Sequence, residues 1–458
     1  MAQNKKRNLS HIFCTLCATL LLLFSCETLS KQRPKPATPQ QEPAQTANSP
    51  QQEENDVPQI TAEDIQEIVE EARHSGAETV ADVQAFAADV FNDGSPIVTS
   101  DTVFDGQDTI LLTFAGDIMA HSQNFSKGRF NEIYKDIQPF VSRSDLTFAN
   151  IETPVDESKD YSTYPNFNVH GEYIQAVIDA GFNVFSLANN HTNDQGLQGI
   201  KATKQYFETQ EQITKETERP IYASGVKDSP EAPFTYRLIE VKGWKILFMA
   251  VTEILNTPVY KNYINYIDTD EVSRKEFIEN LRTLRAENPC DLFVLSIHCA
   301  EPEYILTINK HQSNYYHKLL DAGVDVVWAN HPHVAKDWEV LTDASNLPSK
   351  VIFYSMGNTI SGQRRDPSFH FPTMQRDYTG DGYISELRFL RDENGIHIVN
   401  VNPVLVTTYI TPDWLFVVKR LTDDFIAQLR EEGQEEWAHY LEARKRIMQQ
   451  MKGKILWQ

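Results

Sequence analysis

Residues 110–119 read ILLTFAGDIM, a mainly apolar run that ends in Gly116 and Asp117. A short apolar run closed by a glycine is typical of a buried β-strand. Comparable runs follow at residues 147–151, 184–188, 246–251, 292–297, 324–329 and 351–355. Stretches with helical spacing of apolar residues lie among them, at residues 173–180, 197–209, 272–286 and 312–322. Strands that alternate with helices predict an α/β fold.

The end of the chain departs from this alternation. Residues 382–406 contain two strand-like segments around Asn394-Gly395, a dipeptide that favours a tight hairpin turn. Residues 413–452 are highly charged and have helical spacing, which predicts a solvated helical cap. We therefore expect a main domain over residues 109–410 and a C-terminal helical extension over residues 411–458.

Composition excludes several classes of protein. The chain has 458 residues, of which 41% are hydrophobic, and a formal net charge of -22. Such an acidic chain lacks the basic surface that nucleic acid binding requires, so no nucleic acid partner is expected. Since only one long apolar run is present, at the N-terminus, a protein with several membrane spans is also excluded.

The N-terminal run has the features of an export signal. Lys5, Lys6 and Arg7 precede an apolar stretch over residues 12–24, which is too short to span a bilayer. It ends in Leu23-Phe24-Ser25-Cys26, which resembles a bacterial lipoprotein lipobox. The resemblance implies removal of residues 1–25 and a lipid on Cys26. We expect a membrane-anchored lipoprotein of the cell envelope that faces the periplasm or the exterior; the alternative is an ordinary signal peptide that contains this cysteine.

Two further segments precede the main domain. Residues 26–57 are rich in Pro, Gln, Ala and Thr and predict a disordered tether. Residues 58–93 predict a helical appendage, which either packs on the main domain or binds a partner. In the main domain, Cys290 and Cys299 flank a predicted strand. Their separation of roughly 30 Å exceeds the ~7 Å that a disulfide allows, so both thiols are expected to be free.

Polar side chains follow almost every predicted strand. They are Asp117, Asn150 and Glu152, Asn189 to His191 with Asp194, Glu253, His298, Asn330 to His333, and Asn358. In α/β folds, the carboxyl ends of strands line the ligand site. A single strand-end Asp or Asn often only caps a helix or turn. The repetition at successive strands instead predicts one shared site.

The residue types at these strand ends favour divalent metal binding. Carboxylates, carboxamides and imidazoles without a thiolate suit one or two ions of Mn, Zn or Fe. Two such ions activate water and hold a phosphoryl-like oxyanion. His331 and His333 reach one site only if the backbone kinks, and Pro332 restricts it. Cys299 adjoins His298, but its side chain is expected to point to the opposite face of the strand.

These motifs together resemble a known family. From about residue 111 to residue 406, the chain is similar to the poly-γ-glutamate capsule biosynthesis proteins (CapA/PgsA-like), which are themselves similar to calcineurin-like metallophosphoesterases. The matching stretches are Gly116-Asp117-Ile118-Met119, Asn150-Ile151-Glu152-Thr153-Pro154, Asn189-Asn190-His191 with Asp194 and Gly196, His298 with Glu303-Tyr304, Asp321-Ala322-Gly323-Val324-Asp325, His331-Pro332-His333-Val334, and Tyr354-Ser355-Met356-Gly357-Asn358.

The resemblance implies a four-layer α/β/β/α sandwich with a metal centre at the strand ends. It implies that Asp117 bridges two ions. Glu152 and His333 would bind one ion, and Asn190, His298 and His331 the other. His191 would face the substrate as a proton donor or oxyanion stabiliser, with Asp194 as the second catalytic residue.

The chain departs from the family pattern at three places. Met119 stands where the Asp-x-His motif of phosphoesterases has histidine, which weakens one metal site, and the next histidine is His121. Cys299-Ala300 replaces a Trp-Gly pair, and Ala329-Asn330 replaces Gly-His. The fold expectation does not depend on these positions.

Three functions fit the sequence. The first is a CapA/PgsA-type lipoprotein that helps make, move or anchor an anionic capsule polymer such as poly-γ-glutamate, with capsule synthase subunits as partners. The second is a surface metallophosphoesterase that hydrolyses a phosphate ester. The third is a non-catalytic surface binding protein. Arg364, Arg365 and Arg376 form either a lid over an anionic substrate or a solvated loop.

Overall fold

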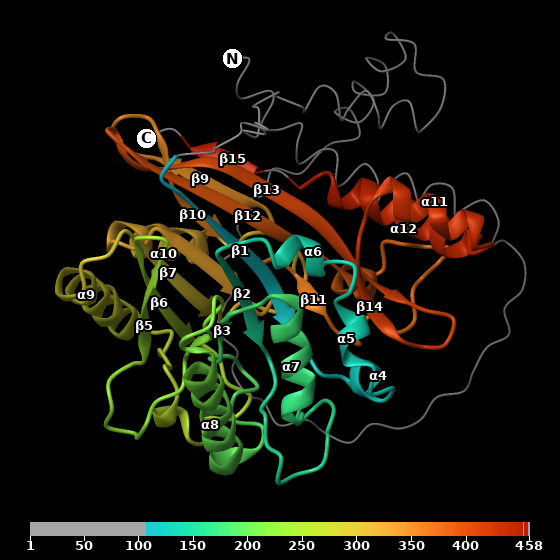
Figure 1. The fold of residues 1–458 in the computed structure, drawn as a ribbon, viewed down its shortest axis with the longest axis horizontal. Coiled ribbons are helices and arrows are strands. Elements are labelled where there is room, and N and C mark those ends of the chain that lie inside the picture. The colour runs from blue at the N-terminus through green and yellow to red at the C-terminus, as the bar shows by residue number, and fades with distance from the viewer. Residues whose placement is uncertain (1–106, 452, 457–458) are drawn as a thin grey trace, which may run out of the picture. The chain divides into compact units, whose positions relative to one another are not determined.

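The computed structural model describes residues 107–451 and the backbone of residues 453–456 (Figure 1). All of them belong to one compact unit, Pro96–Gln458. The expected signal peptide, Cys26, the tether and the helical appendage lie outside the described residues. Among the helices that the structure describes, none has the length and apolar character needed to cross a bilayer.

Two β-sheets form the centre of this unit. The first sheet has eight strands in the order β14-β13-β12-β1-β2-β3-β4, with β11 paired to β1. Its bounds are β1 Thr109–Ile118, β2 Leu146–Ile151, β3 Val184–Ser186, β4 Tyr222–Ser224, β11 Asn358–Ile360, β12 Asp381–Asp392, β13 Gly395–Ile410 and β14 Phe416–Arg420. The second sheet has seven strands in the order β15-β9-β10-β8-β7-β6-β5. Its bounds are β5 Tyr236–Val241, β6 Trp244–Thr252, β7 Leu292–His298, β8 Val326–Asn330, β9 Trp338–Thr342, β10 Pro348–Phe353 and β15 Gly453–Leu456.

Both sheets are mixed, and their central strands are parallel. In the first sheet β1 to β4 are parallel neighbours, whereas β12 runs antiparallel to β1. In the second sheet β6, β7, β8 and β10 are parallel, and β5 and β9 are antiparallel edges of that group. The carboxyl ends of the central strands therefore collect at one edge of each sheet.

Aromatic side chains fill the space between the sheets. The ring of Phe114 in β1 lies 4.6 Å from that of Phe148 in β2 and 5.9 Å from that of Trp328 in β8, measured between centroids. Trp328 Nε1 also donates a hydrogen bond to the carbonyl of Ala115, 3.0 Å away. Burial of each such side chain contributes about 1.5–3 kcal/mol, so this layer fixes the two sheets face to face.

Helices cover the outer faces of both sheets, with shorter turns between strands. They are α4 Ser122–Phe125, α5 Phe130–Ile133, α6 Gln138–Val141, α7 Gly171–Ala180, α8 Gly196–Thr214, α9 Glu271–Glu287, α10 Lys310–Asp321, α11 Asp423–Glu431 and α12 Glu435–Met448, with 3-10 turns η1 Lys261–Tyr263 and η2 Gln375–Gly380. Helices α7 and α8 lie on the first sheet and α9 and α10 on the second (Figure 1). The expected α/β/β/α order of layers is thus confirmed.

The secondary structure follows the sequence pattern closely, with additions. Each expected strand and helix of the main domain is present, and β12 and β13 form the expected hairpin, whose Gly395 has a φ of 103°. Strands β4, β5, β9, β11, β14 and β15 were not expected from the sequence. Most of them are short and lie at sheet edges, where the apolar pattern is weak. Cys290 and Cys299 are free thiols, as expected.

The C-terminal segment differs from the expected solvated helical cap. Strand β14 extends the first sheet, and β15 pairs with β9 of the second. Helix α12 buries Tyr440, Leu441 and Arg444, so it packs against the sheets instead of standing in solvent. The buried face of this helix could not be recognised from its sequence, because the helix is highly charged and one of its buried side chains is itself an arginine.

Candidate metal centre

The six expected metal ligands meet where the carboxyl ends of both sheets come together. Asp117 lies in β1 and Glu152 directly follows β2, whereas His298 ends β7. Asn190 is in the loop after β3, and His331 and His333 follow β8. All six side chains are buried. The first sheet thus supplies the carboxylates and the carboxamide, and the second sheet supplies the imidazoles.

These residues form two overlapping groups with metal-site spacing. In one group, ligand atoms of Glu152, His331 and His333 all lie within 4.8 Å of one another. In the other group, the same holds for Asp117, Glu152 and His298. Asn190 extends the second group, since its Oδ1 is 2.8 Å from His298 Nε2. The carboxylate common to both groups is Glu152, and Asp117 belongs to the second group.

Glu152 fits a cation better than it fits a hydrogen-bond network. Both of its carboxylate oxygens are buried, and neither has a hydrogen-bond partner among the described residues. Glu152 Oε1 lies 3.8 Å from His298 Nε2 and 3.6 Å from His333 Nε2. These distances are too long for hydrogen bonds, but ligand atoms about 2 Å from one ion are themselves roughly 3–4 Å apart. His331 Nδ1 is likewise buried without a partner.

Burial and neighbouring charges shift the pKa values of several residues in the two ligand groups. Burial, and then the charge of Asp117, raise the pKa of Glu152 well above its usual value. Burial and the neighbouring imidazoles lower the pKa of His298 well below its usual value and that of His331 to about 3. Neutral imidazoles are the form in which histidine binds metals.

Two asparagine side chains orient the expected ligands Asp117 and His333 through hydrogen bonds. Asn150 Nδ2 donates a hydrogen bond to Asp117 Oδ1, 2.8 Å away. His333 Nδ1 lies 3.0 Å from Asn358 Oδ1 and 3.2 Å from Asp117 Oδ2. Burial acts to lower the pKa of His333, but Asp117 outweighs it, so this pKa is raised. Because Nδ1 is occupied, His333 Nε2 is left for a metal.

The sequence pattern placed Asn150 and Asn358 at the shared site but did not show that they orient other side chains. Asn150 lies near the end of β2, and Asn358 begins β11, which pairs with β1 beside Asp117. Glu253 shows why position alone is insufficient. It also ends a strand, but it pairs with Arg274 at 2.8 Å and does not join the ligand groups.

Unusual backbone angles aim both histidines of the His-Pro-His segment at the site. The φ angles of His331 and His333 are 104° and 57°, and that of Tyr304 is 65°. Non-glycine residues seldom adopt such φ values, and the residues that do so cluster at functional sites. Tyr304 N donates to the carbonyl of Pro332, 2.9 Å away, so the two strained loops support each other. The expected kink is therefore present, but it lies at the histidines themselves.

His191 stands beside the ligand groups, and Asp194 holds it in place. His191 Nδ1 is 2.6 Å from Asp194 Oδ2, and this carboxylate also accepts a hydrogen bond from the Phe167 amide at 2.8 Å. His191 lines a cavity next to the ligands, whereas Asp194 does not. Asp194 is therefore placed to orient the imidazole and not to touch a substrate.

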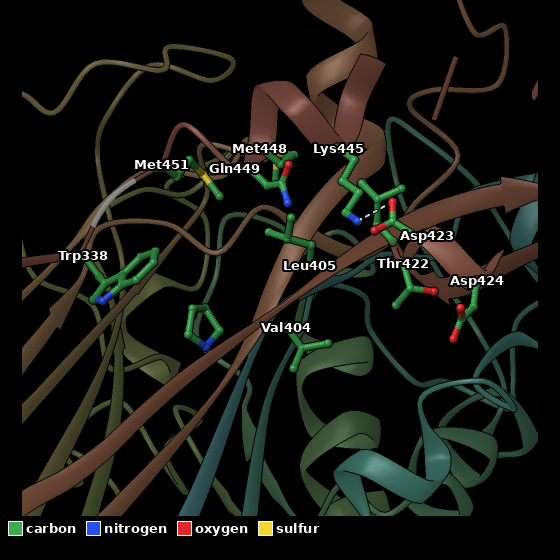
Figure 2. A pocket seen from close by; sticks show the side chains of 12 residues that line it. Trp338, Val404, Leu405, Thr422, Asp423, Asp424, Lys445, Met448, Gln449 and Met451 are labelled. Carbon is green, nitrogen blue, oxygen red and sulfur yellow. Dashed lines mark ion pairs between the residues drawn. The ribbon is translucent and has the colours of Figure 1, made fainter. Parts of the chain in front are cut away.

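That cavity has a volume of about 560 Å³ and opens above the histidines. Its wall includes His191, His333, Tyr304 and Arg376. A second cavity of about 510 Å³ lies between β9, β13, α11 and α12 (Figure 2). Trp338, Leu405 and Met448 line it together with an ion pair between Lys445 and Asp423, and none of the expected site residues does. The first cavity is thus the one associated with the ligand groups.

The residues at the departures from the family pattern do not join the ligand groups. Met119 and His121 both line the first cavity, and His121 Nδ1 accepts a hydrogen bond from the Gly362 amide at 3.1 Å. Cys299 packs in the apolar layer outside the second sheet, as expected. Burial raises the pKa of this thiol to about 12, so it is not a metal-binding thiolate.

Comparison with known sequences gives consistent matches. A family model described as "Bacterial capsule synthesis protein PGA_cap" matches residues 111–363. The chain is 26% identical over 265 residues to the capsule biosynthesis protein CapA of Bacillus anthracis, which covers 56% of this chain and 60% of that protein. It is 27% identical over 265 residues to the PGA biosynthesis protein CapA of Bacillus subtilis (strain 168), which covers 56% of this chain and 64% of that protein. The chain therefore spans less than two thirds of the length of these relatives.

Comparison with solved structures gives only distant similarity. A hypothetical protein from Thermus thermophilus aligns over 65% of this chain and 98% of its own, with 15% identity and a TM-score of 0.38. The calcineurin-like phosphoesterase YfkN from Bacillus subtilis aligns over 73% of this chain and 99% of its own, with 11% identity and a TM-score of 0.36.

Proposed function

The chain belongs to the PGA_cap family of bacterial capsule synthesis proteins, and from this premise we propose that it acts in the cell envelope on an anionic capsule polymer of the poly-γ-glutamate type, through a divalent-metal centre. Its role would lie in the synthesis, transport or anchoring of that polymer. The observation that carries the proposal is Glu152, a buried carboxylate that has no hydrogen-bond partner among the described residues and is common to both ligand groups.

Six residues are available to hold one or two ions of Mn, Zn or Fe. They are Asp117, Glu152, Asn190, His298, His331 and His333. When bound, such ions would polarise a phosphoryl or carbonyl oxygen and activate water. Asn150 and Asn358 fix the directions of Asp117 and His333, so the ligands are oriented before an ion arrives.

The arrangement of His191 favours bond cleavage over binding alone. Asp194 occupies Nδ1, so Nε2 of the imidazole is free to hold or donate a proton toward a molecule in the cavity. An imidazole oriented by a buried carboxylate is not needed for a pure binding surface. Hydrolysis of a phosphate ester is therefore the second candidate function, and the same pair supports it.

We expect replacement of His191 by asparagine to lower the amount of surface polymer by at least about tenfold in a strain that depends on this gene, because a positioned proton donor contributes strongly to catalysis. The purified variant should keep its bound metal, as measured by mass spectrometry of the metal content. A matched change at an exposed histidine, His439→Asn, should leave polymer unchanged. If the strain with His191→Asn makes as much surface polymer as the wild type, His191 is not a catalytic residue and the centre has only a binding role.

The location in the envelope is part of the same proposal. We expect the mature chain to begin at the lipid-bearing Cys26, because the sequence before this residue resembles a lipoprotein signal. Growth with a labelled fatty acid should mark the wild-type chain and not Cys26→Ala. An unlabelled wild-type chain recovered from the soluble fraction would contradict this location.

A further inference from the structure

We propose that the cavity above the ligand groups contains a separate anion-recognition subsite, formed by Arg376 with support from Arg365 and Tyr304. Its ligand would be a carboxylate or phosphate group on the same molecule whose reacting part faces His191. The inference deepens the proposed function and rests on it for the identity of the reacting part.

Arg376 is an available cation on the cavity wall. It is exposed, lines the cavity, and forms no ion pair within residues 107–451. Its guanidinium carbon lies 5.1 Å from the centroid of the Tyr304 ring, which holds the side chain by a cation–π contact. In a chain with a net charge of -22, a guanidinium left without a carboxylate beside a cavity is suited to an anionic ligand.

Two carboxylates on the same cavity wall limit the positions at which an anion can bind, because they repel it. Asp366 pairs with Arg365, with 3.1 Å between Oδ2 and Nε, so Arg365 is partly neutralised and plays the smaller part. Glu303 also lines the cavity, and its negative charge contributes to the raised pKa values of Glu152 and His333. Besides burial, Glu303 raises the pKa of the Tyr304 hydroxyl, so its charge acts both there and at the ligand groups and repels an anion from that side of the cavity. The favourable position for a ligand anion is at Arg376.

Tyr304 connects this position to the metal ligands. Its ring centroid is 6.2 Å from that of His333, and its hydroxyl accepts a hydrogen bond from Gln363 Nε2 at 3.3 Å. An anion on Arg376 is thus separated from the ligand groups by one aromatic ring. This spacing suits a molecule whose anionic group is a few bonds from its reacting atom, such as one residue of a γ-glutamyl chain or a phosphate ester with a second acidic group.

The loop that carries both arginines is fixed by a buried ion pair at one end and by hydrogen bonds to a buried aspartate at the other. Arg364, next to Arg365, pairs with Asp381 at 2.6 Å and is itself fully buried, so it is neither a lid residue nor solvated. Asp377, next to Arg376, accepts hydrogen bonds from Tyr440 of α12 at 2.7 Å and from the Ser368 amide at 3.0 Å. A loop held in this way loses little conformational entropy when an anion binds.

The test measures binding of two probes to the full chain by calorimetry at low salt. The probes are a short γ-glutamyl peptide and glycerol phosphate, which separate a carboxylate from a phosphate as the recognised group. Arg376→Gln should lower the affinity for the preferred probe by about tenfold, because one charge-assisted hydrogen-bonding partner is lost. Arg365→Gln should lower this affinity less. Metal content and melting temperature should stay at the wild-type values in both variants.

Arg282→Gln is the matched control, since Arg282 is an exposed arginine of α9 that pairs with Glu279 away from the cavity. It should change binding by less than about twofold, as expected for a distant screened charge. Equal probe binding by Arg376→Gln and wild type would overturn the inference, and so would binding of neither probe by wild type. Failure of the proposed metal centre would look different: wild type would contain no divalent metal, while probe binding would still depend on Arg376.

Discussion

Replacing Glu152 by glutamine should remove divalent metal from the protein and at the same time stabilise the metal-free form. The buried carboxylate has no hydrogen-bond partner within the described residues, and burial raises its pKa well above the usual value. A neutral amide of the same shape removes this cost, so the free energy of unfolding of the chelator-treated variant should exceed that of the wild type by about 1–3 kcal/mol.

With metal present, the order of stability should reverse. An ion at about 1,000 times its dissociation constant stabilises the wild type by about 4.1 kcal/mol, which exceeds the advantage of the metal-free variant. The variant should gain nothing because both ligand groups share Glu152. Urea unfolding with and without added Mn²⁺ or Zn²⁺, together with the metal content of the purified chains, measures both effects.

Glu253→Gln is the matched control for this prediction. Glu253 is also a buried glutamate at a strand end, but Arg274 neutralises it at 2.8 Å. This control should lose stability in the metal-free form and keep its metal. If Glu152→Gln instead behaves like Glu253→Gln, Glu152 is a structural residue and the metal centre is wrong.

Replacing Asp381 by asparagine should lower the free energy of unfolding by about 3–5 kcal/mol, because it leaves two buried guanidinium groups without their shared counter-charge. Arg364 Nη1 and Arg444 Nε each lie 2.6 Å from an oxygen of this carboxylate, and all three side chains are buried. Urea unfolding measures the loss. Asp423→Asn, which removes the mostly exposed partner of Lys445, should have only the small effect of a surface pair.

The same cluster predicts the sensitivity of the protein to acid. Burial would raise the pKa of Asp381, but the charges of Arg364 and Arg444 outweigh it and hold this pKa below its usual value. The contribution of the ion pairs is therefore fully present above the unfolded pKa near 3.9 and is lost as pH falls through the lower folded pKa. Below about pH 4 the wild type should lose this part of its advantage over Asp381→Asn. A constant difference between the two down to pH 2 would contradict the assignment.

Much of the fold could be predicted because its signals are local. Apolar runs of strand length and stretches of helical spacing are properties of neighbouring residues, so the order of the main elements followed from them. The C-terminal segment was harder to predict. Phe416–Arg420 forms β14 by pairing with β13, and Arg444 of α12 is buried by an aspartate 63 residues earlier in the chain. Such distant partners leave no local pattern.

The candidate site divides in the same way. The sequence by itself determined which residues lie at strand ends, and its resemblance to the capsule biosynthesis family singled out Asp117, Glu152 and the three histidines among them. Only the tertiary structure decided their roles. It made Glu152 the carboxylate common to both groups, placed Asp194 behind His191, and aimed His331 and His333 through positive φ angles. Strand ends are encoded by local periodicity, but distances between ligand atoms depend on how two separate sheets pack against each other.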